Sequence, residues 1–174
     1  NMMDLDLLVG SGGVLSHAPR REQSAKMLID SFMPEGITQL AVDSIFMMPQ
    51  LGVLAEVDKI EFKEESRKAA LEVFHKDCLI RLGTCVSPVG KSKKNEIILI
   101  AELVMPDGEI KNIELKKNDL IRIKVPYEAI KAKLLPSKKM NIGAGVGQEI
   151  QTVLYGGTVG LIFDGRDRPI SIPD

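Results

Sequence analysis

Tryptophan is absent from this sequence of 174 residues, and Phe and Tyr together bring the aromatic share to only 4%. Sites that stack nucleobases or hold carbohydrate depend on aromatic side chains, so this scarcity argues against both kinds of site. The formal net charge is −1, which gives no overall attraction to nucleic acid or to anionic lipid. We therefore expect neither nucleic acid nor a membrane among the partners of this protein.

Cysteine is scarce as well, because Cys78 and Cys85 are the only two, and no Cys or His pair stands beside them at zinc-ligand spacing. No hydrophobic run approaches the length of a membrane span, and no signal peptide opens the sequence. These absences favour a cytoplasmic protein with two reduced thiols and no metal site. On one expected strand the two cysteines should face opposite sides and should not bridge each other.

What the sequence does contain is a hydrophobic share of 44%, enough for a buried core. Residues 5–9 predict a strand, residues 21–32 a helix, residues 37–42 a second strand, and a further helix runs to about residue 55. This alternation is typical of a parallel sheet covered by helices. Two strands are too few for such a sheet, so we expect the other strands to come from elsewhere. We also expect the chain to be a fragment, which the unusual start Asn1-Met2-Met3 favours.

The later part of the chain has a different pattern. Residues 57–77 predict a charged connecting helix, and from residue 78 short apolar segments alternate with turns. Pro-Asp-Gly at 106–108 predicts one hairpin, and Gly156-Gly157 predicts a second. The sequence thus predicts an α+β fold with a β-α-β-α part (1–56), a connecting helix (57–77) and a small all-β barrel or sandwich domain (78–174).

The first candidate site is the turn formed by Gly10, Ser11, Gly12 and Gly13. It could be a tight strand-to-helix turn in which glycine permits a positive φ. Alternatively, the missing Cβ atoms allow the backbone to lie against a flat or anionic ligand at the carboxyl end of a parallel strand. No Gly-Lys-Ser/Thr follows, so the turn is not a P-loop, and its glycine spacing does not fit the dinucleotide-binding fingerprint.

The other candidate residues and motifs have a simpler interpretation. Asp43 follows the second strand and can accept backbone N–H bonds as a helix cap. GAGVG at 143–147 lacks a following Lys-Ser/Thr and favours a bend between strands. DGRDRP at 164–169 favours a solvated turn over an anion-binding or partner-docking loop, and KSKK at 91–94 favours a solvated loop. His17 has no nucleophile and acid at a recognisable spacing, so no catalytic residue is predicted.

An apolar strand that ends in Gly-x-Gly-Gly before a helix resembles the adenosine-binding motif of the actin, sugar kinase and Hsp70 ATPase fold. The longer strings LLVGSGGVLSHAPRR, AVDSIFMMPQLGVLA, DCLIRLGTCVSPVG and GGTVGLIFDGRDRPI resemble the C-terminal part of the glutamate mutase L family. That family is unrelated to the mismatch-repair protein with a similar name. The resemblance implies an actin-like ATPase that acts as a reactivating chaperone for an adenosylcobalamin-dependent mutase or aminomutase.

The resemblance also implies roles for parts of this chain. The glycine-rich turn, residues 10–13, would contact adenosine, Asp43 could lie on the nucleotide side, and the β-domain would contact the mutase or couple to it. The phosphate hairpins and the Mg²⁺-binding carboxylates of that fold lie upstream, and nothing in this chain supplies them. We therefore assign ATP and Mg²⁺ to the full-length protein, and expect the fragment to require no cofactor. Two alternatives stay open: a non-catalytic binding or assembly module, and a small-molecule kinase-like enzyme of the same fold.

Overall fold

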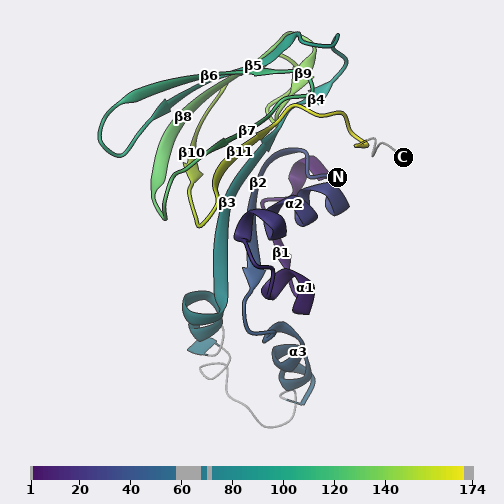
Figure 1. The fold of residues 1–174 in the computed structure, drawn as a ribbon, viewed down its shortest axis with the longest axis vertical. Helices are drawn as coiled ribbons and strands as arrows, with labels where there is room; N and C mark the ends of the chain where they lie inside the picture. Colours follow the sequence, from purple (N-terminus) through teal and green to yellow (C-terminus); the bar gives the residue numbers. More distant parts are fainter. Residues whose placement is uncertain (1, 58–67, 70–71, 171–174) are drawn as a thin grey trace.

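The computed structural model describes residues 2–57, 68–69 and 72–170 (Figure 1). Its helices are α1 (Gly13–Ser16), α2 (Arg21–Phe32) and α3 (Met48–Val57), with a 3₁₀ turn at Met2–Asp4 and a π-helical turn at Phe74–Cys78. Its strands are β1 (Leu7–Gly10), β2 (Gly36–Asp43), β3 (Leu79–Ser87), β4 (Val89–Gly90), β5 (Ile97–Val104), β6 (Ile110–Lys116), β7 (Leu120–Ile123), β8 (Ala129–Pro136), β9 (Met140–Asn141), β10 (Ile150–Tyr155) and β11 (Gly160–Asp164). None of the described helices is long and apolar enough to cross a membrane.

A five-stranded sheet in the order β1-β2-β3-β11-β7 joins the two ends of the chain. Two pairs of neighbouring strands are parallel, β1 with β2 and β3 with β11. The other two pairs, β2 with β3 and β11 with β7, are antiparallel. The predicted parallel sheet is therefore correct only for β1 and β2. The strands expected from elsewhere include three from the later part of this same chain, because β3 runs from the helical part into the β part (Figure 1).

Helix α2 is defined at both ends by its own sequence. The Arg20 backbone N–H donates to the Gln23 side-chain oxygen over 3.1 Å, as in a capping box. The helix stops at Met33, which is left-handed (φ 47°) and precedes Pro34. Its buried side chains pack against the five-stranded sheet: Ala25, Leu28 and Ile29.

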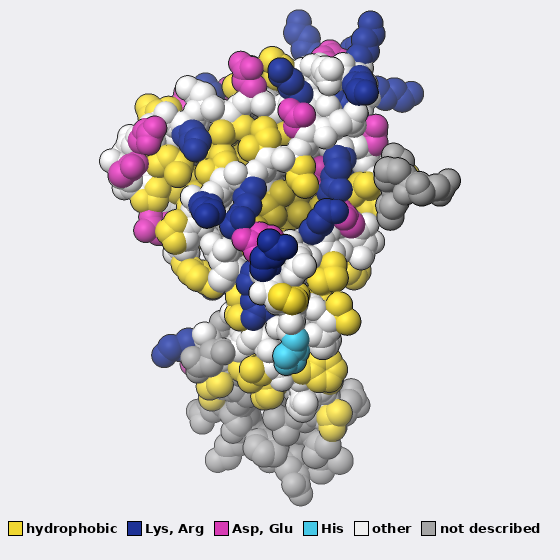
Figure 2. All heavy atoms as spheres, viewed as in Figure 1, with side chains coloured by type: hydrophobic (Ala, Val, Ile, Leu, Met, Phe, Trp, Pro, Cys, Tyr) yellow, Lys and Arg dark blue, Asp and Glu magenta, His cyan; other side chains and the backbone are white. Residues whose placement is uncertain are grey.

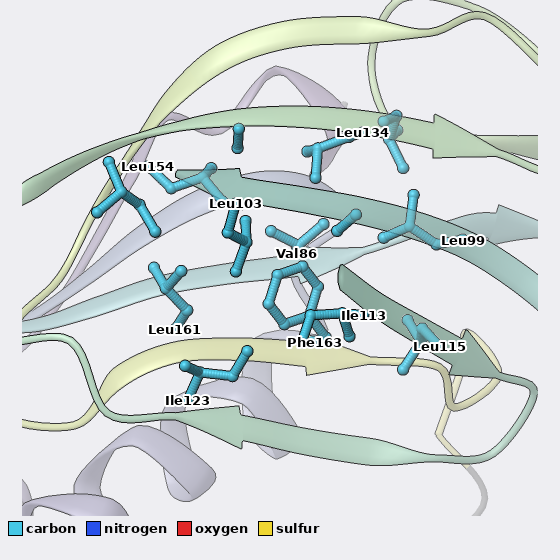
Figure 3. Close-up of a cluster of buried hydrophobic side chains, with 14 of the residues drawn as sticks. Val86, Leu99, Leu103, Ile113, Leu115, Ile123, Leu134, Leu154, Leu161 and Phe163 are labelled. Carbon is cyan, nitrogen blue, oxygen red and sulfur yellow. The ribbon is translucent and has the colours of Figure 1, made fainter. Parts of the chain in front are cut away.

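The second sheet is antiparallel throughout, in the order β10-β8-β5-β6, and faces the β3-β11-β7 side of the first sheet (Figure 1). Burial alternates strictly along β8, so one face of this sheet is buried and the other is exposed. The apolar side chains of the two sheets meet in one core (Figure 3), which includes Val86, Leu99, Leu103, Ile113, Leu134, Leu154, Leu161 and Phe163. The α+β class is confirmed. The described strands form a sandwich-like pair of sheets and a separate two-stranded sheet, β4-β9, with no closed barrel.

Gly156 and Gly157 were predicted to turn a hairpin, and this prediction is wrong. β10 pairs with β8 in one sheet, whereas β11 pairs with β3 and β7 in the other. The two glycines lie where the chain crosses between the sheets. Their backbone N–H groups donate to the carbonyls of Glu128 and Val125 over 2.8 and 3.0 Å. The Pro-Asp-Gly hairpin, in contrast, is confirmed as the turn between β5 and β6.

The connecting helix predicted for 57–77 lies largely outside the described residues, except for α3, which ends at Val57, and the π-helical turn at Phe74–Cys78. The five-stranded sheet includes strands from both sides of this segment. The predicted division of the chain into 1–56, 57–77 and 78–174 therefore describes the order of the elements along the sequence. As a set of domain boundaries it stays a prediction.

Candidate functional site

The glycine-rich turn lies at the carboxyl end of β1, where the structure turns directly into α1. Gly12 has φ 111°, a conformation that side chains rarely adopt, and it precedes the first residue of the helix. Its carbonyl accepts the N–H groups of Leu15 and Ser16 over 3.1 and 2.9 Å. A turn that requires glycine is thus present at Gly12.

The other glycines of the turn differ in what surrounds them. A Cβ on Gly10 would lie 2.8 Å from side-chain carbons of Leu15 and Leu28, so this buried glycine lets α1 and α2 pack on β1. A Cβ on Gly12 or Gly13 would have no atom within 4 Å. Open space therefore lies beside Gly12 and Gly13, whereas Gly10 faces the protein interior.

Asp43, the last residue of β2, is brought next to the turn by the parallel pairing of Gly10 with Val42. Its carboxylate accepts three hydrogen bonds, from the backbone N–H of Met48 (2.8 Å), the backbone N–H of Met47 (3.0 Å) and the hydroxyl of Ser11 (3.1 Å). Asp43 therefore caps the start of α3 through its carboxylate, although it is not the residue that directly precedes the helix, because α3 begins only at Met48. The same carboxylate also fixes Ser11 of the glycine-rich turn.

The environment of Asp43 keeps its carboxyl ionised. Burial of the side chain acts to raise the pKa, but hydrogen bonds from Met48, Met47 and Ser11 outweigh it, so the pKa lies below the usual value. A carboxylate already engaged by three donors is a poor proton acceptor. Its role is therefore to hold the end of β2, the start of α3 and the turn in one arrangement.

The variant Asp43→Asn should lower the free energy of unfolding by about 1–2 kcal/mol near neutral pH, because charge-assisted hydrogen bonds are lost. Since the folded pKa is depressed, the contribution of Asp43 is complete above the unfolded value of about 4 and is lost as the pH falls through the folded value. The difference between wild type and variant should therefore narrow in acid. Urea unfolding at neutral and acid pH measures it, with Asp6→Asn, an exposed carboxyl, as the control. An equal effect of both substitutions would contradict the role of Asp43.

Three neighbours of the turn were missed from the sequence. The buried Ser16 donates its hydroxyl to the Asp43 backbone carbonyl, Arg21 donates to the Ser16 carbonyl over 2.9 Å, and Ser24 donates to the Leu15 carbonyl over 2.8 Å. His17 lies outside this set, because its Nδ1 is 3.2 Å from the Gly13 carbonyl on the surface. No sequence signal marked the serines, since their partners are set by how α1 and α2 lie against β1 and β2.

Exposed apolar side chains stand on both sides of the turn. Val14 is 75% exposed, and Ile45, Phe46 and Met48 are also largely exposed in the segment after β2. Phe46 has a left-handed backbone (φ 61°), which is uncommon for an aromatic residue. Figure 2 shows hydrophobic side chains on the surface of the lower, helical part of the molecule. An open groove of about 490 Å³ begins at Val14 and continues along the outer side of α2 past Pro19 and Met27.

Neither thiol is a reactive group. Both Cys78 and Cys85 are buried and unbridged, as the sequence predicted, but they do not share a strand, because Cys78 ends the π-helical turn and only Cys85 lies on β3. Burial raises the pKa of Cys85 to about 12, so its thiol stays protonated at neutral pH. Within residues 2–57, 68–69 and 72–170, no three His, Cys, Asp or Glu side chains converge in a way that could hold a metal ion.

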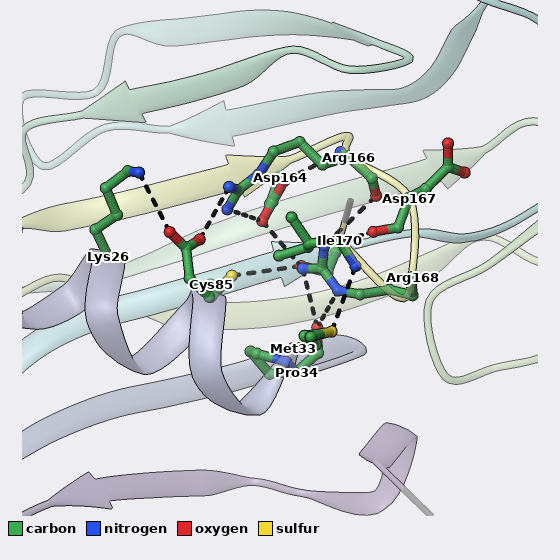
Figure 4. A network of polar contacts seen from close by, with 11 residues as sticks. Lys26, Met33, Pro34, Cys85, Asp164, Arg166, Asp167, Arg168 and Ile170 are labelled. Carbon is green, nitrogen blue, oxygen red and sulfur yellow. Dashed lines mark hydrogen bonds and ion pairs between the residues drawn. The ribbon is translucent and has the colours of Figure 1, made fainter. Parts of the chain in front are cut away.

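The segment 164–169 was predicted to be a solvated turn. This prediction is wrong for Asp164 and Arg168, whose side chains are buried in an ion cluster (Figure 4), whereas Asp167 and Pro169 are exposed. The fully buried Asp164 carboxylate accepts from Arg166 Nη2 over 2.8 Å and from Arg168 Nη2 over 3.0 Å. Burial acts to raise the pKa of Asp164, but the hydrogen bonds from Arg166 and the charge of Arg168 outweigh it and hold the pKa low. Arg166 also pairs with Asp30 of α2 over 2.9 Å.

Arg168 is the more deeply buried of the two arginines, with 4% of its side chain exposed. It donates to the Ser87 hydroxyl over 2.7 Å and to the Pro34 carbonyl over 3.2 Å. The cluster therefore ties the end of β11 both to β3 and to the segment that follows α2. The sequence could not reveal this, because these partners lie far from residues 164–168 along the chain.

Comparison with known proteins gives one match. Residues 1–78 match the model of a family described as MutL protein. The matched segment contains the glycine-rich turn, Asp43 and α2, and it ends just before β3. No curated protein and no solved structure matches the chain. The family resemblance is thus confirmed over residues 1–78.

Proposed function

Residues 1–78 of this chain belong to the MutL protein family, and from this premise we propose that the protein serves an adenosylcobalamin-dependent mutase. The family in question is the glutamate mutase L type, which is distinct from mismatch repair. The family match is the observation that carries the proposal. The protein would act within an ATP-dependent reactivating chaperone whose partner is a mutase or aminomutase, in the cytoplasm.

Adenosine contact is assigned to the glycine-rich turn. Gly12 and Gly13 have no side chain, and a Cβ on either would have no atom within 4 Å, so the backbone there is open to the approach of a flat ligand. Ser11 and Asp43 would hold the turn in position rather than touch the ligand, because they bond to each other. We assign no adenosine contact to Gly10, because it faces Leu15 and Leu28.

The phosphate groups of ATP and Mg²⁺ are not assigned to this chain. The described residues contain no converging set of three possible metal ligands, so they do not fit a role in holding Mg²⁺. The chain would contribute the adenosine side of the site, and the parts that clamp phosphate would lie elsewhere in the full-length protein. Such a half-site should bind nucleotide weakly and hydrolyse nothing by itself.

The variant Gly13→Val should weaken binding of ATP and ADP by about tenfold or more, equivalent to about 1.4 kcal/mol. The valine would project into the space beside the turn and block the ligand. Its Cβ would have no protein atom within 4 Å, so the fold should be unchanged. Titration calorimetry of the full chain at millimolar nucleotide measures the affinity. Ala144→Val, which adds similar bulk to an exposed glycine-rich loop of the β part, is the matched control.

Unchanged nucleotide affinity in Gly13→Val would exclude the turn as the contact. Absence of measurable nucleotide binding by the wild type would favour a binding module without nucleotide. Binding to a purified adenosylcobalamin-dependent mutase separates the chaperone from a kinase-like enzyme of the same fold. Deleting the β part is not a clean test of its role. β3 and β11 complete the sheet that contains β1 and β2, so the deletion would also remove the support of the turn.

A further inference from the structure

Two lysine-rich loops meet at one end of the sandwich. Lys91, Lys93 and Lys94 follow β4, and Lys138 and Lys139 precede β9. β4 and β9 are paired antiparallel, with Gly90 opposite Met140, so the two loops continue side by side from a common ladder. Figure 2 shows Lys and Arg side chains projecting at this upper end, where Figure 1 places β4 and β9. We call these five residues the lysine patch.

The charge of the lysine patch is not neutralised. All five residues are exposed, and no carboxylate in the described part of the chain pairs with any of their ammonium groups. The nearest acid along the chain, Glu96, accepts the backbone N–H of Lys93 over 2.9 Å. Some lysines elsewhere do have partners, as Lys133 has Glu149 over 3.3 Å. Five unpaired positive charges on a protein with a net charge of −1 make this end distinctly electropositive.

The neighbouring glycine-rich loop at 143–147 does not add a phosphate cradle. The Asn141 side-chain oxygen accepts the N–H groups of Gly143 and Gly145 over 2.9 and 3.0 Å. The N–H of Gly147 donates to the Met140 carbonyl over 2.7 Å. The N–H groups of the three glycines of this loop are therefore already used within the protein, and the predicted bend is confirmed.

The composition of the two loops indicates the kind of partner. Neither segment 87–96 nor segment 137–147 contains an arginine or an aromatic residue. Arginine forks are the usual means of binding phosphate, and aromatic faces are the usual means of stacking bases. Lysines alone, on flexible stems, suit the diffuse negative charge of carboxylates on a protein surface.

We propose that the lysine patch is the docking surface for an acidic face of a protein partner. The proposal deepens the proposed function and rests on it for the identity of that partner, the mutase. This proposal replaces the sequence-based interpretation of KSKK at 91–94 as a solvated loop. The sequence could not show that Lys138 and Lys139 lie beside that loop, because only the pairing of β4 with β9 brings them there. Contact at this end leaves the glycine-rich turn free, since the turn lies in the other part of the molecule (Figure 1).

The test uses the full chain and a labelled poly-L-glutamate probe, with binding followed by fluorescence anisotropy. The patch variant Lys91→Glu/Lys93→Glu/Lys139→Glu should bind about tenfold more weakly than wild type at about 50 mM salt, and salt should weaken the wild type. The control Lys111→Glu/Lys124→Glu/Lys131→Glu changes the net charge equally at exposed, unpaired lysines elsewhere on the sandwich. The affinity of this control for poly-L-glutamate should stay within about twofold of the wild-type affinity. Thermal unfolding of both variants confirms that the fold is retained.

Equal losses in the two variants would overturn the proposal, because binding would then depend on net charge alone. Tighter binding to a labelled DNA duplex than to poly-L-glutamate would also overturn it and favour nucleic acid. A purified adenosylcobalamin-dependent mutase is the second probe. If wild type binds poly-L-glutamate through the patch but does not bind the mutase, the lysine patch stands and the proposed function fails.

Discussion

Replacing Asp164 with alanine should lower the free energy of unfolding by about 3–5 kcal/mol, since it removes the carboxylate that neutralises two arginines. Arg168 would stay buried, with 4% of its side chain exposed, and without its charged acceptor. Asp164→Asn should be almost as destabilising, because it preserves shape but not charge. Urea unfolding of the full chain, followed by circular dichroism, measures both variants.

The pH dependence of the stability difference between wild type and Asp164→Ala tests whether the lost carboxylate charge causes the destabilisation. The folded pKa of Asp164 is depressed, so its contribution is complete above the unfolded value of about 4 and is lost as the pH falls through the lower folded value. The gap between wild type and Asp164→Ala should therefore close in strong acid. Asp119→Ala, at an exposed carboxyl before β7, is the control. A loss for Asp164→Ala no larger than that of the control would show that the cluster does not stabilise the fold.

The second large effect is expected at Gly83, where β3 and β11 come unusually close. Gly83 is paired with Gly160, and a Cβ on Gly83 would lie 1.7 Å from the Gly160 carbonyl oxygen. That oxygen belongs to the backbone of a central strand, so it cannot move aside as a side chain can. Gly83→Ala should cost about 4 kcal/mol or more, which for a domain of ordinary stability means little folded protein.

The variant Gly108→Ala is the control that measures the cost of backbone strain without a steric clash. Gly108 lies in the β5–β6 turn with φ 86°, and a Cβ there would have no atom within 4 Å. This control should lower the free energy of unfolding by only about 1–2 kcal/mol, because the alanine must adopt a left-handed backbone conformation. Yield of soluble protein and limited proteolysis compare the two variants. If Gly83→Ala were no worse than Gly108→Ala, β3 and β11 could not be paired at this position.

Both predictions test the same structural idea, that the two parts of the chain form one connected unit. β3 pairs with β2 on one side and with β11 on the other. The cluster around Asp164 adds a second connection, from β11 through Arg166 to Asp30 of α2. The glycine-rich turn precedes α2, and the lysine patch lies at the far end of the sandwich beyond β3. The turn and the lysine patch therefore lie on one connected unit.

Local features were predicted well because local sequence determines them. The helix predicted at 21–32 is α2, and β1 and β2 lie within two residues of their predicted limits. Apolar spacing, a capping residue and a Pro after the helix are all encoded within a few neighbouring positions. The candidate turn and the capping role of Asp43 were predicted for the same reason. The contact between Ser11 and Asp43 was not, since it follows from the pairing of β1 with β2.

The sequence by itself therefore determined the α+β class, the two strands and two longer helices of residues 1–56, the glycine-rich turn and the family resemblance of residues 1–78. Only the tertiary structure decided which strands share a sheet, that Gly156-Gly157 crosses between sheets, and that Asp164 is buried between two arginines. It alone brought Lys91 and Lys139 to one surface. The physical reason is that hydrophobic periodicity specifies which face of a strand is buried but not which distant strand will cover it. Pairings across tens of residues, and the charges that they bury or expose, are set when the whole core is packed.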